Sequence, residues 1–394
     1  MLERMRAVWL TRFGDPSVLV GGEAPDPVPG PGQVLVDVAI ANITFIETMF
    51  RKTGFGPFQG ELPMIPGNGV GGLVSALGEG VDPALLGTRV VTSTGGSGGY
   101  ATRAAVDAAS LVPVPDGLDL DTAVALLADG RTALLLCHAA TLEPGDRVLV
   151  EAAAGGVGTL LVQLAARAGA TVVAALGATP PDPTAPTAAS PTDTPAGATR
   201  GITQPDLASP TGTPAGAARG ATQPDLASPT GAAVVEAFGA GPTDGGPGPG
   251  SLGEAKVAAV RALGVDVVVD YTRPGWEASV GPVDVVFDGV GGEVARAAFG
   301  LLQPGGRMVS FGLSSGAWSD VTEAEAAARQ VAVIRGASGS PEELRARSAE
   351  ALQLAARGEL RPVIGQRFPL ERAADAHAAI ESRSTVGKTL LVVD

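Results

Sequence analysis

Val148-Leu-Val-Glu-Ala-Ala-Ala-Gly-Gly-Val-Gly158 decides the fold, because a short apolar run leads through a glycine-rich turn into an amphipathic pattern. Read as Ala153-x-Gly155-x-x-Gly158, the turn is the dinucleotide fingerprint with alanine in place of its first glycine. Gly155 lets the backbone approach a pyrophosphate, Gly158 allows close packing of helix on strand, and the helix start supplies oriented N–H donors. The sequence therefore predicts a nucleotide at this turn rather than a plain strand-to-helix connection.

Apolar runs alternate with helical patterns from about residue 121 onward, which predicts an α/β fold with a parallel sheet covered on both faces. The first third differs, because period-two alternation and Gly/Pro turns predict a small barrel-like or sandwich β domain there. The expected strands are 33–41, 69–77, 88–92, 147–152, 170–176, 265–270, 283–287 and 307–311, and the expected helices are 121–141, 157–168, 254–263 and 292–302.

Residues 177–253 form a Pro/Gly/Ala/Thr-rich insert in which a 19-residue unit repeats. Residues 195–212 recur almost unchanged as 214–231, and a decayed copy precedes them. A unit with one recurring leucine has no apolar stripe to bury, so we expect an exposed, disordered insert rather than a solenoid. The insert also carries 231–240, which resembles 169–178, so either copy could form the second strand of the sheet. The copy at 170–176 is favoured, because it follows the preceding helix after an ordinary connection.

The end of that second strand predicts which dinucleotide binds. Residues 174–177 read Ala-Ala-Leu-Gly without the acidic residue that selects NAD, so a 2′-phosphate would meet no repulsion there. Lys256 and Tyr271 are candidates to contact that phosphate, which favours NADP over NAD; the alternative is that they are a solvated helix lysine and a rim aromatic. If the second copy forms the strand instead, Glu236 falls near the acidic position and the preference for NADP weakens.

Composition excludes several classes of function. With 27 basic and 41 acidic residues the net charge is −14, which disfavours nucleic acid and anionic membranes as partners. The sequence shows neither a signal peptide nor an apolar run of membrane-spanning length, and its one cysteine suits a reducing compartment, so we expect a cytoplasmic protein. Cys137, His138 and His377 are the only Cys or His residues, too few for structural zinc and in no recognisable triad, so no metal is predicted.

A series of short motifs resembles the zinc-independent quinone oxidoreductase branch of the medium-chain dehydrogenase/reductase superfamily. The resemblance covers essentially the whole chain outside the insert. It implies a GroES-like catalytic domain over 1–127, a Rossmann NADP-binding domain with a doubly wound sheet over 128–318, and a segment over 319–394 that completes the catalytic domain. The motifs are Met5-Arg-Ala7, Asp26-Pro-Val-Pro-Gly-Pro-Gly-Gln-Val-Leu-Val36, Ile65-Pro-Gly-Asn-Gly-Val-Gly-Gly72, Gly130-Arg-Thr-Ala133, Ala152-Ala-Ala-Gly-Gly-Val-Gly158, Phe287-Asp-Gly-Val-Gly-Gly292, Pro304-Gly-Gly-Arg307, Phe311-Gly312 and Gly387-Lys388.

The resemblance also implies the residues of the site, in a cleft between the two domains. NADPH would be held by Thr132, Gly155, Gly156, Val157, Gly158, Lys256, Tyr271, Val290, Phe311 and Gly312. Zinc-binding members carry Gly-His-Glu where this chain has Gly67-Asn68-Gly69. Thr44 stands where an asparagine is common near the nicotinamide, and it is the candidate polar contact to the acceptor oxygen. Arg131 replaces a frequent apolar residue and would anchor an anionic group or lie as a surface charge.

The expected reaction is hydride transfer from NADPH to a quinone or similar conjugated carbonyl acceptor, which requires placement of two partners rather than a dedicated acid or base. Two alternatives stay open: an enoyl-thioester or enone reductase on the same scaffold, and a non-catalytic NADPH-binding protein. The partner is expected to be a small-molecule electron acceptor, and the resemblance implies a homodimer.

Overall fold

The computed structural model describes residues 4–58, 60–177, 249–265, 267–336 and 338–393. The repeats and the second strand copy at 231–240 lie outside the described residues, so the predictions made for them are not tested. The description resumes with helix α5 (Pro249–Arg261), which begins inside the predicted insert boundary of residue 253.

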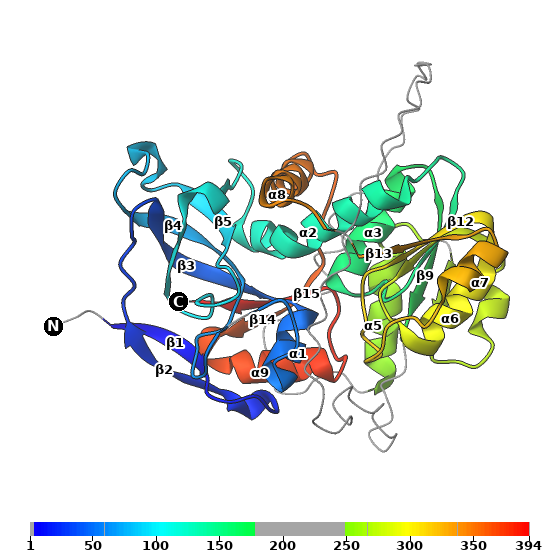
Figure 1. The fold of residues 1–394 in the computed structure, drawn as a ribbon, viewed down its shortest axis with the longest axis horizontal. Coiled ribbons are helices and arrows are strands. Elements are labelled where there is room, and N and C mark those ends of the chain that lie inside the picture. Colours follow the sequence, from blue (N-terminus) through cyan, green and yellow to red (C-terminus); the bar gives the residue numbers. More distant parts are fainter. Residues whose placement is uncertain (1–3, 59, 178–248, 266, 337, 394) are drawn as a thin grey trace, which may run out of the picture. The chain divides into compact units, whose positions relative to one another are not determined.

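A six-stranded parallel sheet forms around the fingerprint (Figure 1). Its order is β10-β9-β8-β11-β12-β13, which in chain order is 3-2-1-4-5-6, the doubly wound Rossmann arrangement. The strands are β8 (Arg147–Val150), β9 (Thr171–Leu176), β10 (Val267–Asp270), β11 (Val283–Asp288), β12 (Leu302–Ser310) and β13 (Ala332–Arg335). The predicted second strand, 170–176, is thus confirmed as β9.

Successive side chains of β8 enter two different cores, which explains why the strands read as unbroken apolar runs. Val148 and Val150 pack in one core with helix α3 (Gly156–Arg167), whereas Leu149 packs in another with α6 (Gly292–Leu301) and α7 (Glu323–Ala328). A parallel strand covered on both faces needs apolar residues at every position. The prediction of a sheet covered on both sides is therefore confirmed.

The β-rich part forms a second, mostly antiparallel sheet (Figure 1). Its order is β14-β15-β3-β4-β5-β7, with β6 also paired to β3, and a separate hairpin joins β1 to β2. The bounds are β1 (Arg4–Leu10), β2 (Leu19–Pro25), β3 (Gln33–Ile43), β4 (Gly69–Leu77), β5 (Arg89–Ser93), β6 (Arg103–Asp107), β7 (Val112–Pro113), β14 (Ile364–Pro369) and β15 (Lys388–Val392). Because β14 and β15 pair beside β3, the final segment does complete this sheet.

The predicted boundary at residue 318 is too early. Strand β13 pairs in parallel with β12, and α7 packs beside it, so the Rossmann unit continues to about residue 335. Helix α8 (Pro341–Ala356), β14, α9 (Ala373–Glu381) and β15 follow it. The run 332–335 has only three apolar residues before Arg335, too short a pattern to predict a strand from the sequence.

Helix α2 (Leu120–Ala140) serves both sheets. Leu120 and Val124 pack against Gly71 of β4, while Gly130 packs against Ala351 of α8. Within the described ranges α2 is the one helix whose length and composition would suit a membrane span, and most of its residues are buried inside the protein. Its apolar composition is thus that of a core helix.

Candidate active site

The fingerprint turn, residues 152–158, closes with the geometry that its glycines predict. Helix α3 begins at Gly156 with Gly155 as its N-cap in extended backbone. A Cβ on Gly158 would lie 2.3 Å from the carbonyl oxygen of Ala152, so only glycine lets the helix approach the turn this closely. A Cβ on Gly155 would meet only the Ala152 oxygen, at 3.2 Å, so that side of the turn stays open to a ligand. Because the first amide groups of a helix have no intrahelical acceptor, those of Gly156, Val157 and Gly158 suit a pyrophosphate.

A buried ion pair stands beside this helix start. Lys388 Nζ lies 2.9 Å from Asp129 Oδ1, and the two side chains are 4% and 10% exposed. The other carboxylate oxygen of Asp129 occupies the space that a Cβ on Gly156 would fill, 2.0 Å from that position. Gly156 is therefore required by Asp129, a contact that the sequence pattern did not reveal.

Strand β15 connects the fingerprint turn with the mostly antiparallel sheet. The Gly387 amide donates to the Ala154 carbonyl at 2.7 Å, and Gly387 forms a bridge with Gly155. Two residues further on, Thr389 pairs with Ile43 of β3 in antiparallel register. Thr44, the predicted acceptor contact, follows Ile43 directly, so these contacts place Thr44 close to the nucleotide turn.

Thr44 is part of what we call the Thr44 cluster: Thr44, Glu47 and Asn68. Glu47 Oε2 accepts from the Thr44 amide at 2.6 Å and from the Thr44 hydroxyl at 2.7 Å, while Glu47 Oε1 accepts from the Asn68 amide at 2.9 Å. Glu47 is 5% exposed, whereas Thr44 is half-buried. Burial raises the pKa of Glu47, against the lowering effect of these hydrogen bonds and of Lys388. The spacing Thr44-x-x-Glu47 at the start of α1 (Phe45–Thr53) is a capping box, a signal that could have identified Glu47 from the sequence.

Lys256 and Tyr271 meet at the end of β9, as predicted. The Lys256 ammonium donates to the carbonyls of Gly177 at 3.0 Å and Arg383 at 2.9 Å, and the Tyr271 hydroxyl lies 3.2 Å from the Cβ position of Gly177. Two of the three ammonium N–H donors are therefore engaged, and Lys256 is buried, so its phosphate contact stays a prediction. Sequence reasoning missed Arg383, which is half-buried and donates to the Ser314 carbonyl. Burial, and after it the Arg383 charge, lowers the pKa of Lys256, whereas burial raises the pKa of Tyr271 against the opposing effect of Arg383.

Val290, Phe311 and Gly312 converge at the carboxyl ends of β11 and β12. The amides of Phe311 and Gly312 both donate to the Asp288 carbonyl, and a Cβ on Gly312 would lie 2.4 Å from the Gly289 oxygen. The Val290 amide donates to carboxyl oxygens of Glu151 and Asp288, each at 3.2 Å. Both carboxyl groups are fully buried, and burial with the neighbouring Asp288 charge raises the pKa of Glu151 well above its usual value. This carboxyl pair, also missed from the sequence, fixes the loop that carries Val290.

Thr132 and Arg131 lie on α2 after Asp129, and both are half-buried. Arg131 follows Val124 by seven residues and so continues, two turns on, the helix stripe that packs on β4. Burial lowers the pKa of Arg131, and within the described ranges its guanidinium has no hydrogen-bond or ion-pair partner.

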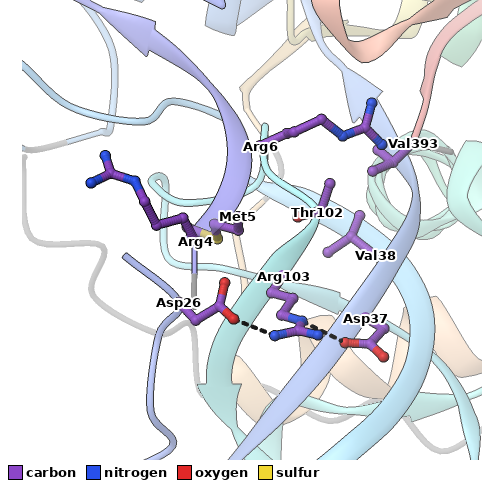
Figure 2. Close-up of a pocket in the computed structure, with 9 residues that line it drawn as sticks. All are labelled: Arg4, Met5, Arg6, Asp26, Asp37, Val38, Thr102, Arg103 and Val393. Carbon is purple, nitrogen blue, oxygen red and sulfur yellow. Dashed lines mark hydrogen bonds and ion pairs between the residues drawn. The ribbon is translucent and has the colours of Figure 1, made fainter. Parts of the chain in front are cut away.

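A pocket on the antiparallel part of the fold is lined by other residues. Arg4, Met5, Arg6, Asp26, Asp37, Val38, Thr102, Arg103 and Val393 line it. Figure 2 shows Arg103 between Asp26 and Asp37, with which it forms ion pairs. The charge of Arg103 is thus balanced by these two carboxylates, and no predicted site residue lines the pocket.

A 3-2-1-4-5-6 parallel sheet with a glycine-rich turn after its first strand defines the class of dinucleotide-binding α/β proteins. Comparison with known families agrees: residues 30–116 match the alcohol dehydrogenase GroES-like domain, and residues 263–391 match a family described as zinc-binding dehydrogenase. The chain belongs to the medium-chain dehydrogenase/reductase superfamily, in its quinone oxidoreductase branch.

Individual relatives support this placement. A quinone oxidoreductase of Pseudomonas aeruginosa is 28% identical over 98% of this chain and 99% of its own length. A 2-haloacrylate reductase of a Burkholderia species is 35% identical, but only over 42% of this chain and 51% of that protein. Among solved structures, a mycobacterial protein complexed with NADPH has a TM-score of 0.71 and 26% identity, covering 98% of this chain and all of its own.

The residues present do not fit a catalytic zinc, despite the description of one matching family. Asn68 stands in the stretch where zinc-binding members have their Gly-His-Glu, and both Glu47 oxygens already accept protein hydrogen bonds. His377 is buried with its Nε2 2.9 Å from the Tyr100 hydroxyl, and burial raises the pKa of the Cys137 thiol to about 12. In the part of the chain that the structure describes, no three His, Cys, Asp or Glu residues form a group able to hold a metal.

Proposed function

We propose that this chain is an NADPH-dependent oxidoreductase that reduces a quinone or a similar conjugated carbonyl without zinc. The observation that carries the proposal is the contact of Gly387 with Ala154, beside the Lys388–Asp129 pair, which brings Thr44 to the fingerprint turn. The quinone oxidoreductase relatives and the NADPH complex of a structural neighbour support it. When bound, the cofactor supplies the hydride, and the chain binds, orients and shields the two reactants.

We propose that NADPH is preferred over NADH because β9 ends at Leu176 and is followed by Gly177, with no carboxylate at either position. Tyr271 and the third N–H of Lys256 lie at that edge, and Arg383 adds a second positive charge beside them. A 2′-phosphate at this edge would thus meet the Lys256 and Arg383 charges, while the carboxylate of Asp270, at the end of the neighbouring strand β10, is paired with Arg273. Arg383→Ala should weaken NADPH binding more than NADH binding, and an equal loss for both would contradict this selectivity.

The test of function is NADPH oxidation by the purified chain with a small quinone, an enone and a 2-enoyl thioester as separate acceptors. We expect turnover with the quinone. Turnover with the thioester alone would support the alternative of an enoyl-thioester reductase. Tight NADPH binding, measured by fluorescence titration, without turnover of any acceptor would support a non-catalytic NADPH-binding protein and overturn the proposal.

A second candidate substrate is an anionic α,β-unsaturated acid. It is favoured by Arg131, half-buried and without a partner in the described ranges, and by the similarity to a 2-haloacrylate reductase. A guanidinium pairs with a carboxylate through two parallel hydrogen bonds. Arg131→Leu should raise KM for 2-chloroacrylate at least about tenfold, the loss of one charge-assisted contact, and leave KM for a neutral quinone unchanged. A matched Arg131→Lys variant should lie between the two.

A homodimer in the cytoplasm completes the proposal. The half-buried Cys137 thiol suits a reducing compartment. Light scattering of the purified chain and fractionation of the source cells would test the two statements.

A further inference from the structure

We propose that Glu47 and Thr44 form a proton relay to the oxygen of the acceptor, an inference that rests on the proposed function. Reduction by hydride leaves an electron pair on the acceptor oxygen, which then needs a proton. Thr44 has a half-buried hydroxyl beside the nucleotide turn, and Glu47, 5% exposed, holds a carboxyl group 2.7 Å behind it.

The hydrogen bonds of Glu47 suit its neutral form. Its Oε1 accepts from the Asn68 amide and its Oε2 accepts from the Thr44 amide, so both oxygens stay satisfied when a proton sits on Oε2. That proton then points at Thr44 Oγ, 2.7 Å away, and the Thr44 hydroxyl hydrogen turns outward. In the ionised form the same hydrogen points back to Glu47. The protonation state of Glu47 thus decides whether Thr44 donates to a ligand.

Burial and the charges around Glu47 act on its pKa in opposite directions, and the net effect is a raised pKa. Burial raises its pKa, while Lys388 on β15 lowers it, and Lys388 is itself neutralised by Asp129. The charge of Glu47 also acts on Tyr100. Burial, and after it the Glu47 charge, raises the pKa of Tyr100 well above the usual value, so Tyr100 stays neutral. Arg51, on the same helix as Glu47, acts on Tyr100.

The step balances without a further reagent. The Thr44 O–H bond breaks as an O–H bond forms on the acceptor oxygen, and the Glu47 Oε2 proton passes to Thr44 Oγ. Thr44 is restored and Glu47 is left as a carboxylate, which regains a proton from water when the product leaves. The hydride that reduces the acceptor carbon comes from the nicotinamide cofactor.

The test compares kcat, NADPH affinity and pH profile in four variants. Glu47→Gln and Thr44→Val should lower kcat for the quinone about a hundredfold, the usual contribution of a general acid, while the Kd for NADPH stays within twofold. Glu47→Asp and Thr44→Ser keep the acid and the hydroxyl and should recover much of the rate. In the unaltered chain kcat should fall as pH rises through the raised pKa of Glu47, and Glu47→Gln should abolish that limb.

Three outcomes are informative. A wild-type chain without turnover would overturn both the proposed function and the relay. Turnover by the wild type with an unchanged kcat and pH profile in Glu47→Gln would overturn the relay alone. If Glu47→Gln fails to fold because its capping contacts are lost, the Thr44→Val and Thr44→Ser pair decides, since equal rates in those two variants would also overturn the relay.

Discussion

The fingerprint turn and the Thr44 cluster are both well ordered by local contacts, but the contacts are of different kinds. The turn, residues 152–158, uses backbone amides and the absence of side chains at Gly155, Gly156 and Gly158. The Thr44 cluster uses side chains that are buried and hydrogen-bonded to each other. Backbone recognition carries no net charge, whereas the cluster depends on the buried charges of Asp129 and Lys388 nearby. We expect the fingerprint turn to be sensitive to added side-chain volume and the Thr44 cluster to be sensitive to changes of charge and pH.

The largest effect is expected where the two regions join. Asp129→Leu leaves the Lys388 ammonium buried without its partner, which should lower the free energy of unfolding by about 3–5 kcal/mol. Chemical denaturation with far-UV circular dichroism would measure it. The matched double variant Asp129→Leu/Lys388→Met should regain most of the loss, and a double variant as unstable as the single one would show that the pair is not the cause.

The next largest effect is expected when side-chain volume is added in the fingerprint turn. Gly158→Ala places a Cβ 2.3 Å from the Ala152 oxygen and should cost about 3 kcal/mol of stability. Gly155→Ala meets that oxygen only at 3.2 Å, so it should keep stability close to wild type yet weaken NADPH binding about tenfold or more, because the added methyl group faces the ligand. Equal thermal stability of the two variants would contradict the different roles assigned to these glycines.

A smaller effect is expected from pH on the core of the antiparallel sheet, where His377 is buried. Burial lowers the pKa of His377 from 6.5 to about 3, so the folded state holds the neutral ring. The contribution of the neutral His377 ring to the free energy of unfolding is fully present above about pH 6.5. It is lost as pH falls toward 3, by about 1.4 kcal/mol per pH unit. Denaturation of the wild type between pH 6.5 and 4 should show this slope, and His377→Gln should be flatter by that amount. Parallel curves would mean that His377 is protonated at no cost.

No effect is expected from metal removal. Because the donors around Asn68 do not fit zinc, dialysis against a chelator should leave quinone turnover unchanged, and metal analysis of the purified chain should find less than about 0.1 zinc per chain. Loss of activity that added zinc restores would contradict the assignment.

Elements made of contiguous residues could be predicted from the sequence, whereas contacts between distant residues could not. The fingerprint turn is predictable because its strand, glycines and helix are contiguous, and the strand at 170–176 follows from local pattern alone. The Lys388–Asp129 contact joins residues 259 positions apart, and no local pattern announces it. Lys256 was placed at the correct edge, but the carbonyls that bind its ammonium depend on tertiary packing. Strand β13 was missed because four residues of weak pattern become a strand only when β12 lies beside them.

The bridge formed by β15 has a consequence for how the enzyme matures. During synthesis, β3, Asp129 and the fingerprint turn are made long before residues 388–392. In that interval residues 40–43 of β3 lack the hydrogen-bond partners that β15 later provides. Until then Asp129 lacks its lysine, and nothing ties Thr44 to the nucleotide turn. A nascent chain can therefore complete its parallel sheet before Thr44 is tied to the nucleotide turn.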